Sequence, residues 1–255
     1  MKEFFVHKGS IVRKIWGRGD TVLLIFAGAS AEFALNKAVD WLYFTGRLPA
    51  DPIGRLFSTV RYAQEIVFAE RHSAFTAIDK ISAIHKGVEA SRGARIPDTA
   101  YLDVLFMLIG YSIRSFELLE RKLSDKEKGE IFDVFYRVGA RMGLKGLPVN
   151  YQAWELMRAE HLEINLVRSS FTTDLYGKYR ESLGSFRYHI LIQAQILLVP
   201  ASVRKMLSLS SVPLLYPVLQ IYKGSRFLRV DRLFKAMLLP AKYKAEIAGL
   251  DLLTD

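Results

Sequence analysis

His85 is the residue of this chain that is best placed for metal chemistry. Ile81 and Val88 share a helical face with it, so the imidazole lies within an apolar stripe. Neutral imidazole is the commonest metal ligand, although a buried histidine more often makes one structural hydrogen bond. His189, which begins another apolar stretch, is a competing candidate. Spacing alone does not decide whether either histidine is a metal ligand or a structural residue.

Arg55 and Thr59 lie on a second helix, earlier in the chain. They are four residues apart and so share one face. Asp51 can cap this helix, and Pro52 suits its first position because the missing N–H costs nothing there. Arg55 could bind an anionic group through a charge-assisted hydrogen bond, or lie on the surface. Thr59 could equally bond a preceding carbonyl of its own helix.

A metal site built from several side chains is not indicated. The sequence has five histidines and no cysteine, and no second histidine follows another at zinc-binding spacing. Haem needs only one axial group from the protein, because the porphyrin supplies four nitrogens. A single-ligand site at His85 therefore remains compatible with the sequence.

Three segments together resemble the haem-dependent oxygenases that include the latex-clearing rubber oxygenases and MpaB. The first is Ala50–Leu56 followed by Thr59, which is similar to the family's "dP..R...T" helix. The second is Ile84–Val88, which is similar to its "H..V" helix. The third, from Lys122 to Pro148, resembles its "pLs..E … lG … LP" segment. The likeness runs from about residue 23 to about residue 151.

This resemblance implies a haem b enzyme that uses dioxygen. His85 would be the proximal iron ligand, Arg55 and Thr59 would line the haem site, and the apolar helix from Leu23 to Ala34 would cover the distal side. The implied substrate is hydrophobic, isoprenoid or lipid-like, and the implied reaction is oxidative cleavage of a carbon–carbon double bond. Family members often carry tryptophan and histidine where this chain has Met107 and Tyr111, which is a departure within the pocket.

Glu32, Asn36 and Asp40 recur at four-residue spacing. The pattern favours a solvated helix face. The alternative is that a carboxylate, Glu32 in particular, acts as a catalytic base near dioxygen.

The chain is predicted to be all-α, a single-domain irregular bundle of roughly ten helices with globin-like packing. Hydrophobic residues make up 51% of it, helical periods recur throughout, and period-two alternation and hairpin dipeptides do not stand out. Ser124 and Glu127 form a capping box, Gly143 ends a helix and Gly184 breaks one. Residues 45–49 are predicted to be a loop, and residues 1–19 show no clear period.

The formal charge of +10 is concentrated near the C-terminus. Residues 201–245 hold one acidic residue, Asp231, and nine basic ones: Arg204, Lys205, Lys223, Arg226, Arg229, Arg232, Lys235, Lys242 and Lys244. Residues 222–239 read as a basic amphipathic helix, which would dock on the body or attach to an anionic membrane. We expect a catalytic domain at 1–200 and a basic extension at 201–255.

The leading hypothesis is a haem b oxygenase, with cytoplasmic location and possible peripheral contact with a membrane surface. The N-terminus is too polar for a signal peptide, and the longest uncharged run, 17 residues from Met206 to Tyr222, is broken by prolines and too short to span a bilayer. The alternatives are a non-catalytic helical protein of the membrane surface and a haem-binding sensor or carrier. Nucleic-acid binding is not expected, because the basic residues form no recognised reading motif.

Overall fold

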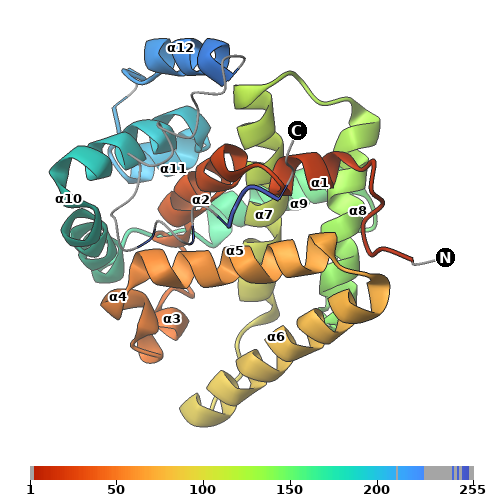
Figure 1. Ribbon diagram of the computed structural model, residues 1–255. Helices are drawn as coiled ribbons and strands as arrows, with labels where there is room; N and C mark the ends of the chain where they lie inside the picture. The colour runs from red at the N-terminus through yellow and green to blue at the C-terminus, as the bar shows by residue number, and fades with distance from the viewer. Residues whose placement is uncertain (1–2, 211, 227–242, 244–245, 247–248, 253–255) are drawn as a thin grey trace.

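The computed structural model describes residues 3–210, 212–226, 243, 246 and 249–252 (Figure 1). Over these residues the chain forms twelve helices and, apart from two isolated bridges, no β-structure, so the all-α prediction is confirmed. The helices are α1 (Ile11–Trp16), α2 (Gly19–Phe33), α3 (Asp40–Phe44), α4 (Arg47–Ala50), α5 (Pro52–Phe68), α6 (Arg71–Arg92), α7 (Asp98–Leu119), α8 (Asp125–Arg141), α9 (Tyr151–Ile164), α10 (Ser170–Leu198), α11 (Ala201–Met206) and α12 (Tyr216–Arg226).

The predicted helix count was close, but short helices were missed, among them α1 and α4. α1 lies in the lead segment that showed no period, and α4 occupies most of the predicted 45–49 loop. Helices of six and four residues carry too few turns for a period to show.

The core is built around α2 and α7, which pack against one another, with α10 and α8 adjoining them. The buried residues of α2 include Val22, Ile25 and Phe26, as its all-round apolar sequence predicts. Gly28 allows the closest approach, because a Cβ there would stand 2.3 Å from the Tyr111 ring of α7. The two helices therefore pack closely at this point.

α5 and α6 form a helical hairpin, and the C-terminal end of α6 extends away from the body of the molecule (Figure 1). The Asp51 carboxylate caps α5 by accepting from the Gly54 N–H at 3.1 Å, and Pro52 is the first helical residue, both as predicted. In α6 the buried residues are Ala74, Ala77 and Ile78, all in its first half. The second half of α6 is thus only partly covered by protein.

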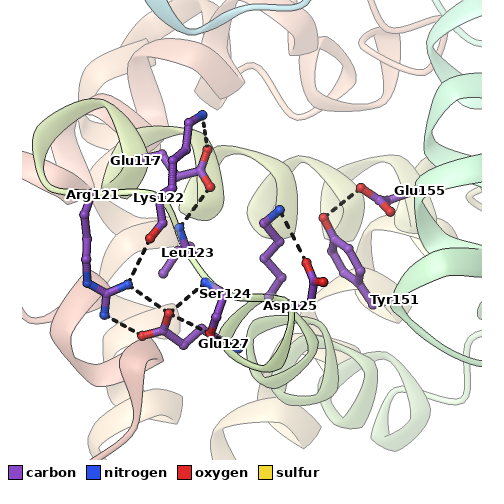
Figure 2. Close-up of polar contacts among 10 residues, drawn as sticks. Glu117, Arg121, Lys122, Leu123, Ser124, Asp125, Glu127, Tyr151 and Glu155 are labelled. Atoms are coloured by element: carbon purple, nitrogen blue, oxygen red, sulfur yellow. Dashed lines mark hydrogen bonds and ion pairs between the residues drawn. The ribbon is translucent and has the colours of Figure 1, made fainter.

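The junction between α7 and α8 is held by local polar contacts (Figure 2). The predicted capping box is present: the Glu127 N–H donates to Ser124 Oγ, and the Glu127 carboxylate accepts from the Ser124 N–H. Arg121 donates to both oxygens of the same carboxylate. These bonds, the Arg121 pair foremost, lower the pKa of Glu127 to about 2, so the carboxylate stays ionised at any ordinary pH.

The C-terminal third folds back onto this core. Gly184 interrupts α10 with φ 72°, where a break was predicted. Leu219 of α12 is buried, and the Tyr222 hydroxyl donates to Asp20 at 2.9 Å. Of the predicted basic helix at 222–239, residues 227–239 lie outside the described part. The domain boundary at residue 200 stays a prediction. Within the described residues no helix is long and apolar enough to cross a bilayer.

Candidate functional site

His85 lies on the partly covered half of α6, facing the start of α7. Its imidazole is half-buried and packs against the Tyr101 ring, with ring centroids 5.1 Å apart. The Nδ1 atom is buried and has no hydrogen-bond partner among the described residues. A buried polar atom without a partner costs free energy, so this nitrogen is a position where a ligand would be favourable.

The surroundings of His85 favour the neutral form of its imidazole. Burial lowers its pKa below the ordinary value of 6.5, the positive charge of Arg55 lowers it further, and Glu89 opposes them. A neutral imidazole can ligate a metal, whereas a protonated one cannot.

Arg55 and Thr59 lie together on α5. The Arg55 Nη1 donates to Thr59 Oγ1 at 2.9 Å and to Ser58 Oγ at 3.0 Å. Burial, followed by repulsion from Arg47, lowers the pKa of Arg55. No carboxylate forms an ion pair with this guanidinium in the part of the chain that the structure describes. Arg55 is therefore a largely buried cation whose bonding partners are neutral hydroxyls.

The structure thus brings three predicted residues into one region. Thr59 bonds Arg55, and Arg55 lies close enough to His85 to shift its pKa. The other residue that acts on His85 and was not anticipated is Glu89, one helical turn along α6. Its carboxylate accepts from the Ile96 N–H at 2.9 Å and from the Tyr101 hydroxyl at 3.4 Å. Glu89 therefore fixes the start of α7 against the histidine.

Glu32 lies elsewhere, in a buried cluster between α2, α7 and α9. It is 1% exposed, which makes the predicted solvated face wrong here. Its carboxylate accepts from both terminal nitrogens of Arg158 and from the Tyr111 hydroxyl at 2.9 Å. Burial alone would lower the pKa of Arg158, but the Glu32 carboxylate raises it overall. Both oxygens of Glu32 are engaged, so this geometry favours a structural role, and its role as a base stays a prediction.

Asn36 is also buried, at 3% exposure, again contrary to a solvated face. Its amide donates to Asp103 of α7 at 2.7 Å, and the same carboxylate is bonded to His161 Nδ1 at 2.6 Å. Asp40, the third residue of the pattern, is half-exposed and pairs with Arg92 at 2.6 Å. The three polar residues therefore face three different partners and do not form one surface.

The remaining histidines do not compete with His85. His189 is exposed, and so are His7 and His72. His161 is held by Asp103. The described residues contain no group of three or more His, Cys, Asp or Glu side chains that could hold a metal ion. A site with a single axial histidine does not require such a group.

Comparison with protein-family models gives a match over residues 13–226, most of the chain, to the catalytic domain of the ER-bound oxygenase mpaB/B' and rubber oxygenases. The chain belongs to this family. The match extends beyond the likeness seen in the sequence on both sides, and it includes α12. Comparisons with curated proteins and with solved structures found no match.

Arg55, Thr59 and His85, the motif residues of this mpaB/rubber oxygenase domain, are all partly exposed. A surface hollow of about 430 Å³ lies elsewhere, between the N-terminal segment, α6 and α8, and its arginines are already bonded, as Arg141 is to Asp79. Met107 and Tyr111 are both buried in the core, and Tyr111 serves the Glu32 cluster. The departure at these two positions is therefore taken up by core packing.

Proposed function

We propose that this member of the family is a haem b-dependent oxygenase acting on a hydrophobic, isoprenoid or lipid-like substrate. Two neighbouring groups carry the proposal: His85, whose buried Nδ1 has no hydrogen-bond partner, and Arg55, a largely buried cation with no ion-paired carboxylate. Both statements hold for the part of the chain that the structure describes. Family membership supports oxygenase chemistry, and this pair supports the kind of cofactor.

The residues present suit a haem. An axial ligand must be a neutral imidazole, and the surroundings of His85 favour that form. A haem propionate needs a cation, and Arg55 has donors that are not committed to an acid. The porphyrin faces need apolar contacts, and the second half of α6 presents Ile81 and Val88, both only half-buried, beside His85. Bound haem would supply the iron that activates dioxygen.

Each residue of the site then has a defined task. His85 would hold the iron through an imidazole nitrogen, with Tyr101 and Glu89 fixing the ring from the side. Arg55 would bind the anionic edge of the cofactor, and Thr59 would orient the guanidinium. The apolar residues of α6 would keep water away from the reacting centre.

The proposed reaction consumes one dioxygen per carbon–carbon double bond. The double bond breaks, each of its carbons gains one oxygen atom, and two carbonyl products form. No other reductant is then needed, and the protein contributes substrate orientation and exclusion of water.

An absorption spectrum of protein purified from haem-supplied cells tests the proposal. A Soret band that shifts on reduction with dithionite and again on adding carbon monoxide is expected, because the iron should have an open side. A featureless spectrum from folded, helical protein, even after added haemin, would contradict it.

Oxygen uptake distinguishes the alternatives. With prenyl compounds, the oxygenase should consume oxygen and form carbonyl products that can be trapped and weighed by mass spectrometry. Haem-loaded protein that consumes no oxygen with any prenyl or unsaturated lipid substrate would favour a sensor or carrier. Colourless protein that binds vesicles would favour a non-catalytic protein of the membrane surface.

A further inference from the structure

Exposed apolar side chains are concentrated in and just before α12. Within residues 212–221 the exposed large apolar residues are Val212, Leu214, Tyr216, Val218 and Ile221. Leu214 is 70% exposed and Ile221 is 68% exposed. Contiguous apolar surface of this kind usually marks an interaction site, whereas single exposed apolar residues need no explanation.

α12 has two distinct faces. Its inner face is fixed to the body by buried Leu219, by the Tyr222 bond to Asp20, and by Lys223, whose ammonium donates to the Leu118 carbonyl at 3.2 Å. Val218 and Ile221, three residues apart, lie on the other face. Because the inner face is anchored, the exposure of the outer face is not the result of a detached helix.

The helix lies at the periphery of the molecule, drawn in blue at the top left of Figure 1. α2 and α7, around which the core is built, lie well inside it. α12 therefore lies at the edge of the molecule in this view, outside the helices of the core.

The sequence around this face is basic. Residues 201–226 contain four basic residues and no acidic one, and over residues 201–245 the ratio is nine to one. An acidic partner surface would be attracted to this segment, and a basic one would be repelled. An apolar helix face within a basic segment is the combination that lies in the interface of an anionic bilayer.

We infer that the outer face of α12 docks the protein on an anionic lipid bilayer, with Val218 and Ile221 inserted among the headgroups. Insertion is interfacial, because α12 has eleven residues and about twenty apolar ones are needed to span the hydrocarbon. Pairing with a second copy is disfavoured, since it would bring together two segments of the same positive charge. The inference does not depend on haem.

Vesicle co-sedimentation of the full chain tests the inference. The probes are phosphatidylcholine vesicles with and without 30% phosphatidylglycerol, at low and at high salt. The wild type should bind the anionic vesicles and bind more weakly at high salt, because screening removes the attraction. The variant Val218→Gln/Ile221→Gln should bind them at least tenfold more weakly.

The matched control is Val149→Gln/Leu156→Gln. These residues are 83% and 78% exposed, so the control removes as much exposed apolar surface from another part of the molecule. It should bind like the wild type, and all three proteins should give the same far-ultraviolet circular dichroism.

Three results would overturn the inference. The first is a wild type that fails to bind anionic vesicles, or binds neutral ones equally well. The second is equal binding by the α12 variant and the control. The third is a concentration-dependent dimer, without vesicle binding, that only the α12 variant abolishes, which would assign the face to a second copy of the chain.

Discussion

Glu32 and His85 were both candidates for chemistry, and the structure gives them opposite surroundings. Glu32 is buried with Arg158 and Tyr111, and both of its oxygens are bonded. His85 is half-buried, and within the described residues its Nδ1 has no hydrogen-bond partner and the nearby Arg55 is bonded to hydroxyl oxygens.

The difference separates structural polar groups from groups that can accept a ligand. A buried polar cluster with every bond made stabilises one packing arrangement and has nothing left to offer a substrate. A buried polar atom without a partner carries a cost that a bound group can remove. On this reasoning the Glu32 cluster joins α2, α7 and α9, and the His85 face is where we propose that the cofactor binds.

The largest effect should come from breaking the Glu32 cluster. Glu32→Gln leaves the Arg158 guanidinium buried beside a neutral amide, and losing one partner of a buried ion pair costs about 3–5 kcal/mol. The free energy of unfolding, measured by urea denaturation, should fall by this amount. Glu32→Leu/Arg158→Met, which removes both charges, should recover most of it.

The control for that experiment is Asp133→Asn, at an exposed pair with Arg137 on α8. An exposed pair contributes under about 1 kcal/mol, so stability should hardly change. A Glu32→Gln protein that is as stable as the wild type but has lost oxygenase activity would overturn the comparison and restore the catalytic-base role.

Replacing Arg55 should have the opposite effect, with little change in stability and a large change in haem affinity. Arg55→Met keeps the apolar stem and removes a buried cation, so stability should change little. If Arg55 binds a propionate, a charge-assisted bond of about 1.5–3 kcal/mol is lost, and the Kd for haem should rise by about ten- to a hundredfold.

Haem titration followed at the Soret band measures the Arg55 effect. Arg61→Met is the matched control, because Arg61 is exposed on the same helix. Equal haem affinity for both variants would remove Arg55 from the site.

Lowering the pH should reduce both the stability that His85 contributes and the affinity for haem. The pKa of His85 is lower in the folded protein than its ordinary value of 6.5, so the unfolded chain binds more protons in the window between the two values. The contribution of His85 to stability is therefore complete above pH 6.5 and is lost as the pH falls below it. Protons also compete with iron for the imidazole, so haem affinity should fall as the pH approaches the lowered pKa of His85 in the folded protein.

This pH effect is the smallest of the three, and it is specific to one residue. The free energy of unfolding of haem-free protein is measured by urea denaturation at pH 8 and at pH 5.5. It should fall less between these two pH values in His85→Gln than in the wild type, because the contribution of His85 is missing. An identical pH dependence in both proteins would show that His85 is not the titrating group.

Local features of the fold were predictable because their causes lie within a few residues. The Asp51 cap with Pro52, the capping box of Ser124 and Glu127, and the break at Gly184 each depend on side chains in one turn. α5 and α6 follow from two helical repeats of apolar residues that are neighbours in the sequence.

The burial of the acidic pattern could not be predicted from spacing. Glu32 finds its partner Arg158 126 positions later, and Asn36 finds Asp103 67 positions later. A repeated polar residue on a helix looks the same whether it meets water or a distant partner. Arg55, Thr59 and His85 were found through the family motif, whereas Tyr101 and Glu89 carry no motif signal and emerged only from the packing.

The most direct test of the account is haem titration of the wild type, His85→Ala and His72→Ala in parallel. His72 lies on the same helix but is exposed, so its loss should leave haem binding unchanged. The wild type and His72→Ala should bind haem stoichiometrically and show a Soret band, and His85→Ala should retain no haem. A His85→Ala protein that keeps stoichiometric haem with an unchanged spectrum would contradict the assignment of His85 as the axial ligand.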